Sequence, residues 1–134
     1  MANWLFKEEP ETYSFADLVR DGSTTWSGVA NPQAQKNLRA IKKGDCVFFY
    51  ATGKVKAVVG VMRVTADPTP DQADATGKRV VVTVEPVRAL AAPVTLAAIK
   101  ADEAFAAREL VKQARLSVMP VPDALWAKVG KMAG

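Results

Sequence analysis

Two neighbouring segments, each apolar on both faces, most constrain how this chain can fold. Residues 46–51 and 56–64 flank the turn sequence Thr52-Gly53-Lys54, so they predict a hairpin. Residues 80–87 form a third run of the same kind. Because a strand with two apolar faces needs cover on both sides, the pattern predicts a sheet that curls into a barrel or is covered by helices.

Two helices are predicted from their end signals. Ser14 is expected to be an N-cap, with Asp17 completing a capping box, and this helix should end near Gly22. Asn31 precedes a proline and predicts the start of a second helix, for which Gly44 is the expected C′ residue.

Weaker signals predict the remaining elements. In the first part of the chain they are a strand over 4–6, a loop over 22–30 and a surface loop over 67–78. The second part is expected to contain a helix over 96–100 capped by Thr95, a helix over about 103–112 and a strand over 115–119. A last helix is expected to start at Pro122 or Asp123, with Leu125, Val129 and Met132 on one face.

Composition excludes much of enzyme chemistry. The 134 residues, a length typical of one domain, include no His and a single Cys. Imidazole catalysis, His-ligated metals, intrachain disulfides and Cys-cluster metal sites are therefore excluded. Cys46 is expected to be a buried small hydrophobe, and Glu8, Glu9 and Glu11 to be a solvated acidic cluster. We expect no cofactor and no metal.

Charge gives a modest indication of a polyanionic partner. The chain has 18 Lys and Arg against 14 Asp and Glu, a net charge of +4. Residues 36–63 hold seven of the basic residues and one acid, although a solvated face remains the alternative. With no targeting segment or apolar run long enough to span a bilayer, we expect a cytoplasmic protein without membrane contact.

Four residues allow either a structural or a binding role. Trp26, among Ser, Thr and Gly, either plugs the core or offers a face to a planar ligand. Asn31 either caps its helix or reads a base edge with its amide. Tyr13 either staples a helix start or stacks on a ligand, and Tyr50 either lies at a rim or packs in the core.

Five ordered blocks carry a resemblance to a known family. They are Trp-Leu-Phe-Lys-Glu-Glu-Pro-Glu-Thr-Tyr-Ser-Phe-Ala-Asp-Leu (4–18), Trp-Ser-Gly-Val-Ala-Asn-Pro-Gln-Ala (26–34), Leu-Arg-Ala-Ile-Lys-Lys-Gly-Asp-Cys-Val-Phe-Phe-Tyr (38–50), Val-Val-Gly-Val (58–61) and Arg-Leu-Ser-Val-Met-Pro-Val (115–121). In order and spacing the chain resembles the EVE domain family over almost its whole length.

The resemblance implies one EVE domain over 1–134, with an α+β, PUA-like curved β-barrel of about five to six strands flanked by helices. EVE domains are related to YTH domains, so it also implies a non-catalytic reader of a modified nucleobase. A monomer is the default expectation. Methylated or hydroxymethylated cytosine and methylated adenine, in DNA or RNA, all stay open. The implied base-binding residues are Tyr13, Ser14, Trp26, Val29, Asn31, Tyr50, Leu116, Ser117 and Val118. The implied phosphate or rim residues are Lys7, Arg39, Lys54 and Arg115.

Three departures from the family pattern bear on the ligand. Ala30 stands where many relatives have Arg, Ala51-Thr52 replaces His-Ser, and the 67–78 loop lacks a common insertion. They are expected to alter the accepted base or weaken binding. Two alternative functions stay open. One is a PUA-like enzyme acting on modified nucleosides or RNA, with Lys7 beside Glu8 or Glu9. The other is a small-molecule or nucleotide sensor using the same pocket.

Overall fold

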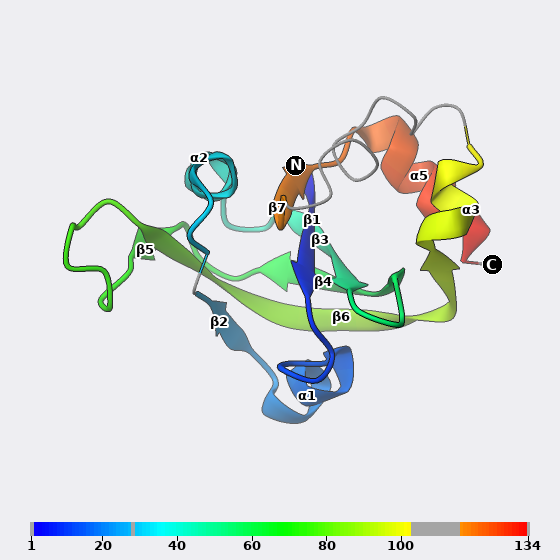
Figure 1. The fold of residues 1–134 in the computed structure, drawn as a ribbon, viewed down its shortest axis with the longest axis horizontal. Helices are drawn as coiled ribbons and strands as arrows, with labels where there is room; N and C mark the ends of the chain where they lie inside the picture. The colour runs from blue at the N-terminus through cyan, green and yellow to red at the C-terminus, as the bar shows by residue number, and fades with distance from the viewer. Residues whose placement is uncertain (1, 28, 103–115, 134) are drawn as a thin grey trace.

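The apolar strands join into one curled sheet (Figure 1). A computed structural model describes residues 2–27, 29–102 and 116–133. The strands are β1 (Asn3–Glu8), β2 (Thr24–Trp26), β3 (Cys46–Ala51), β4 (Ala57–Val64), β5 (Thr69–Pro70), β6 (Val80–Thr95) and β7 (Val118–Pro120). The order across the sheet is β2-β6-β4-β3-β1-β7, and β5 pairs with β6 outside this path. Only β1 and β3, among the described strands, pair in parallel.

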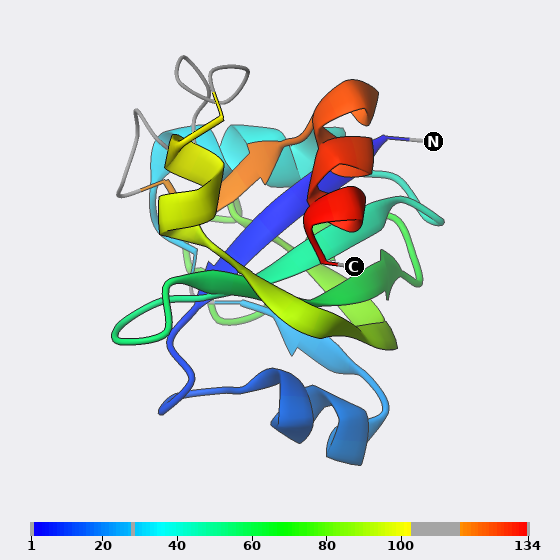
Figure 2. The ribbon, with the colours of Figure 1, turned by 90° about the vertical axis from the view of Figure 1, so that its right-hand side faces the viewer.

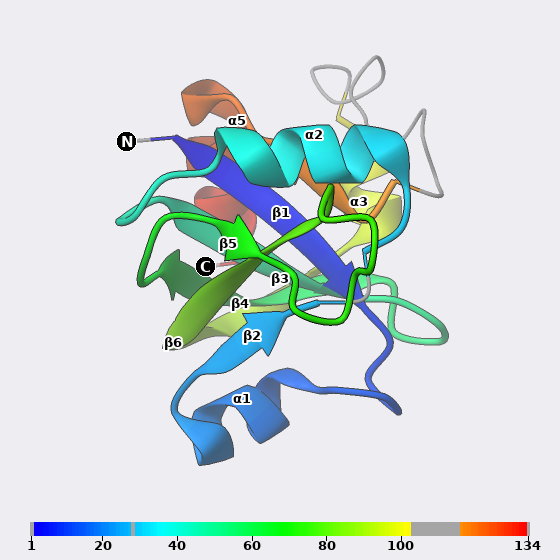
Figure 3. The same ribbon diagram turned by 90° about the vertical axis from the view of Figure 1, so that its left-hand side faces the viewer.

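Helices lie on several sides of this half-barrel. They are α1 (Phe15–Asp21), α2 (Pro32–Ala40), α3 (Leu96–Lys100) and α5 (Asp123–Met132). Figure 2 shows α3 and α5 together on one side, near the C-terminus. Figure 3 shows α2 and α1 on opposite sides of β1 and β2. The fold is therefore α+β, a curved β-barrel-like sheet with flanking helices, as expected.

The apolar faces of β3 explain this arrangement. Successive side chains of a strand point to opposite faces of the sheet, so Phe48 and Phe49 pack on different sides of it. Phe49 contacts Phe15 of α1 edge-on, with ring centroids 5.6 Å apart. Phe48 stacks on Trp126 of α5, with centroids 3.7 Å apart. The hairpin predicted from residues 46–64 is confirmed, and its two apolar faces pack against different helices.

The predicted helix starts are confirmed in detail. Ser14 Oγ accepts a hydrogen bond from Asp17 N, and Asp17 Oδ2 accepts one from Ser14 N, which together form the capping box. Gly22 ends α1 in the left-handed region with φ +80°. Asn31 Oδ1 caps α2 by accepting from two main-chain N–H groups.

A buried carboxylate fastens the start of β1 to the start of β3. Asp45, 4% exposed, accepts hydrogen bonds from Trp4 Nε1 at 2.9 Å and Lys42 N at 2.9 Å through Oδ2. Its Oδ1 accepts a third from Ala2 N at 3.2 Å. These bonds satisfy donors that would otherwise be left without partners as the two parallel strands come together.

Several strand and loop predictions were incomplete or wrong. The predicted surface loop over 67–78 contains the two-residue strand β5, which pairs with β6. The predicted loop over 22–30 contains β2, because its Thr-Thr-Trp residues pair with β6. The strand predicted over 80–87 continues to Thr95, and register shifts between β4 and β6 accompany Pro86. The strand predicted over 115–119 is β7, which begins only at Val118.

Helix ends and burial required further corrections. Helix α2 ends at Ala40 with Ile41 as its extended C-cap, while Gly44, with φ +92°, lies in the following turn and not at C′. Met132 is 36% exposed and does not join the buried face of α5. Cys46 is only half-buried, because it is the first residue of β3. The helix predicted over 103–112 lies outside the described residues.

Gly60 permits a close approach between β4 and α1, which gives a stability prediction. A Cβ at this position would overlap the ring of buried Phe15. Gly60→Ala is therefore expected to lower the free energy of unfolding by about 1–3 kcal/mol through overpacking. Gly130→Ala on α5 is the matched control, since a Cβ there meets nothing within 4 Å. Urea denaturation measures both, and equal stabilities would contradict the packing argument.

Among the described residues, no helix has the length and apolar character needed to cross a membrane. No group of three or more Cys, Asp or Glu within the same part of the chain is placed to hold a metal ion.

Candidate functional site

A pocket lies where the end of β1 and the start of α1 meet β2. Its volume is about 270 Å³, and we call it the strand-end pocket. It is lined by Glu8, Thr12, Tyr13, Thr24, Thr25, Trp26 and Ser27. The lining combines one carboxylate, two aromatic rings and several hydroxyl groups, which suits a small planar ligand with polar edges. Of the base-binding residues expected from the sequence, it brings together Tyr13 and Trp26.

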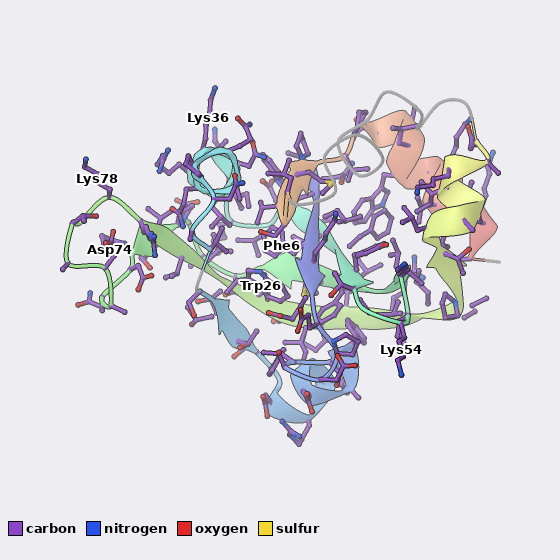
Figure 4. The ribbon with its side chains drawn as sticks, in the orientation of Figure 1. Phe6, Trp26, Lys36, Lys54, Asp74 and Lys78 are labelled. Carbon is purple, nitrogen blue, oxygen red and sulfur yellow. The ribbon has the colours of Figure 1, made fainter. Side chains whose placement is uncertain are left out.

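Trp26 forms part of the pocket wall but mainly plugs the core. It is only 5% exposed. Its ring packs against Phe6, with centroids 5.2 Å apart, and edge-on against Phe49 at 5.6 Å. Figure 4 shows Phe6 and Trp26 next to each other in the middle of the molecule. The indole therefore offers a ligand one edge of an otherwise buried ring.

Tyr13 is the more accessible aromatic of the pocket. Its ring is half-buried, and its hydroxyl donates to Asp21 Oδ2 at 2.8 Å. Burial, followed by this hydrogen bond, raises the pKa of the Tyr13 phenol, so it stays protonated at neutral pH. Ser14, beside it, has its side chain engaged in the capping box of α1.

Asn31 and Val29 perform structural tasks and are not among the residues lining the strand-end pocket. The Asn31 side-chain oxygen is occupied by the N-terminal N–H groups of α2, which favours the capping role over base reading. Val29 is buried, and its carbonyl accepts from Gln35 Nε2 at 2.8 Å.

A second cluster gathers residues from β1, β3 and β7. Lys7 and Tyr50 are opposite each other in the β1–β3 register, and Lys7 Nζ lies 5.6 Å from the Tyr50 ring centroid. Lys7 N donates to Ser117 O at 2.9 Å. Burial lowers the pKa of Lys7 and raises that of Tyr50. Leu116 and Val118, beside Ser117, are both buried.

The predicted rim residues do not form one group. Arg39 lines a groove between α2 and the residues before β6. Lys54 lines another surface hollow with Lys56 and Lys100, at the β3–β4 turn. Figure 4 shows Lys54 on the opposite side of Trp26 from Lys36 and Lys78. Arg115 lies outside the described residues.

Sequence reasoning missed most of the polar lining of the strand-end pocket. Thr24, Thr25 and Ser27 belong to or follow β2, which was predicted as a loop. The β-forming Thr-Thr-Trp run was the available signal. Glu8 was considered only as a solvated or catalytic acid. A strand points Lys7 and Glu8 to opposite faces, which argues against a catalytic pair made from these two.

The comparisons with known proteins agree with the fold. The structure of Rpa0253 from Rhodopseudomonas palustris has a TM-score of 0.94 at 39% identity, covering 100% of this chain and 94% of that one. The human THYN1 protein, solved in complex with DNA containing 5-methylcytosine, has a TM-score of 0.91 at 26% identity, covering 99% and 98%. Among curated proteins, Homo sapiens thymocyte nuclear protein 1 is 35% identical over 82 residues.

The aligned segment of that human protein spans 52% of this chain and 36% of the relative, so the match accounts for about a third of the relative's length. The fold is an α+β half-barrel like that of THYN1, with a pocket at its strand ends. The family model described as EVE domain matches residues 2–132. The chain therefore belongs to the EVE domain family.

Proposed function

We propose that this chain is a non-catalytic module that binds DNA containing 5-methylcytosine and receives the modified base in the strand-end pocket. The observation that carries the proposal is the human THYN1 complex with 5-methylcytosine DNA, whose fold this chain shares over 99% of its length. The positive charge of the chain is consistent with a nucleic-acid partner.

The size and lining of the pocket support a single base as the ligand. Its volume of about 270 Å³ is below the range typical of sites for drug-sized molecules. Cytosine presents an exocyclic amino donor, and a carboxylate such as that of Glu8 is a suitable acceptor. The Glu8 carboxylate is oriented by accepting a hydrogen bond from Glu9 N at 2.9 Å.

Binding in such a pocket requires the base to leave the duplex. Extrusion costs a few kcal/mol, which stacking on an aromatic ring offsets by roughly 1–3 kcal/mol. Tyr13 offers the accessible ring, while the Trp26 edge closes the inner wall. A methyl group in an apolar part of the pocket adds discrimination of about 1–3 kcal/mol.

Tyr13→Ala is the sharpest test of this proposal. It should weaken binding to a methylated duplex by about 1–3 kcal/mol, which is roughly 5- to 150-fold in Kd, and reduce the preference over an unmethylated duplex. Tyr13→Phe is the matched control. It keeps the ring and loses only the hydroxyl, with its hydrogen bonds to Asp21 and Thr24, so its preference should stay near that of the wild type.

Fluorescence anisotropy with labelled oligonucleotides measures these effects. The series contains DNA duplexes with 5-methylcytosine, hydroxymethylcytosine, methyladenine or no modification, and the matching RNAs. Unchanged preference in Tyr13→Ala would refute the pocket assignment. A free methylated nucleoside that binds as tightly as the duplex would instead indicate a small-molecule sensor. Tighter binding of RNA than of DNA would identify RNA as the partner.

A further inference from the structure

A second, strongly basic groove lies between α2 and the segment that leads into β6. Its volume is about 270 Å³, and we call it the α2 groove. It is lined by Ala30, Pro32, Gln35, Arg39, Thr76, Lys78 and Arg79. Three of these residues are cationic and none is a carboxylate. Figure 3 shows α2 and this segment on the face of the molecule that also carries β2.

The wall that carries Lys78 and Arg79 is held in place by one side chain. Asp74 Oδ2 accepts hydrogen bonds from Lys78 N at 3.0 Å and Arg79 N at 2.7 Å. Its Oδ1 accepts from Thr76 N at 3.1 Å and Thr76 Oγ1 at 2.8 Å. These bonds, of which that from Arg79 N has the largest effect, lower the pKa of Asp74 to about 2, so the carboxylate is ionised at neutral pH. The two cations therefore project from an ordered turn.

The opposite wall is fastened to the same segment through Gln35. Its Nε2 donates to Val29 O at 2.8 Å, and its Oε1 accepts from Val80 N at 2.9 Å. Gln35 thus joins α2 to the first residue of β6 through hydrogen bonds. Arg39 is one helical turn further along α2, so it lies on the same helix face as Gln35.

The cations of the groove are available to an external anion. Arg39, Lys78 and Arg79 are exposed, and none of them has an ion-pair partner within the described ranges. The first N–H groups of α2 are already occupied by the Asn31 cap, so the side chains must supply the anion affinity. Guanidinium groups match phosphate oxygens in geometry, and two of the three cations are arginines.

The groove is close to the strand-end pocket along the chain. Ser27 lines the pocket and Ala30 lines the groove. Three residues span at most about 11 Å, and one strand of B-DNA advances about 3.4 Å per nucleotide. A strand whose base occupies the pocket would therefore bring phosphates of neighbouring nucleotides to the groove.

We propose that the α2 groove binds the phosphodiester backbone of the DNA strand beside the base in the strand-end pocket. This inference rests on the proposed function, because it assigns the contact made by the flanking nucleotides. The groove contributes affinity that is independent of sequence and methylation, whereas the pocket contributes the preference for the modified base.

The double variant Arg39→Ala/Arg79→Ala removes one guanidinium from each wall. The matched control is Arg63→Ala/Arg88→Ala, which removes two exposed arginines from β4 and β6 and lowers the net charge equally. All four replaced side chains are exposed, so thermal midpoints near that of the wild type are expected for both variants. Binding of methylated and unmethylated duplexes is measured from about 50 to 200 mM salt.

The groove variant should bind both duplexes about tenfold more weakly at low salt. Its slope of log K against log salt should be shallower by about 2, with the ratio between the duplexes unchanged. The arginine control should keep a slope near that of the wild type. If the wild type prefers the methylated duplex but the groove variant retains its slope, the groove assignment is wrong and the proposed function stands. If the wild type binds neither duplex, both are refuted.

Discussion

Trp26→Ala is expected to lower the free energy of unfolding by about 3–5 kcal/mol. The indole is 5% exposed and fills the space between Phe6 and Phe49, so its removal leaves a cavity between β1, β2 and β3. Urea denaturation of the purified variant measures the loss. A loss under about 1 kcal/mol, the level typical of an average substitution, would contradict the core role.

This stability loss limits what Trp26→Ala can reveal about binding, since weaker binding can follow from unfolding alone. Trp126→Ala provides a matched control, because that indole stacks on Phe48 on the other face of β3. It should destabilise the protein too, yet leave the preference for the methylated base unchanged. Trp26→Phe retains an apolar ring and should lose preference without a comparable loss of stability. An equal loss of preference in Trp126→Ala would show that the effect of the Trp26 variants on preference comes from lower protein stability.

Asp45→Ala is expected to cost about 3 kcal/mol of stability. The carboxylate is buried and accepts hydrogen bonds from Trp4, Lys42 and Ala2, and removing it leaves these donors without their acceptor. A buried donor without a partner costs roughly 1–3 kcal/mol.

Asp45→Asn is the matched variant for this position. It keeps the shape of the side chain and one acceptor oxygen, so the loss should be clearly smaller than that in Asp45→Ala. Chemical denaturation, with amide hydrogen exchange at Lys42, measures both. Equal losses in the two variants would show that shape, and not hydrogen bonding, accounts for the role of Asp45.

Local signals in the sequence were sufficient to predict structure where residues close in the chain form hydrogen bonds with one another. The Ser14–Asp17 capping box and the Asn31 cap involve partners no more than three residues apart, and both are present as predicted. The strand over 46–51 was also predicted with its observed bounds, because a short apolar run beside a glycine turn has few alternatives. The family resemblance extended this local information to the curved sheet.

Long-range pairing determined what the sequence reasoning missed. Thr24–Trp26 becomes a strand because β6, almost sixty residues later, supplies its hydrogen-bond partners. That pairing turns Trp26 onto Phe6 and Phe49 and places Thr24 and Thr25 in the pocket with Glu8. The α2 groove likewise depends on Gln35 reaching Val80.

The sequence by itself therefore determined the strand hairpin, the helix starts, the exclusion of imidazole chemistry and the excess of positive charge. Each follows from composition or from neighbours along the chain. Only the tertiary structure decided that Trp26 is mainly a core residue and that the side-chain oxygen of Asn31 caps α2. It also decided that Arg39 lines the same groove as Lys78 and Arg79. Those outcomes depend on which segments, distant in sequence, pack against one another around the curled sheet, because protein interiors are close-packed.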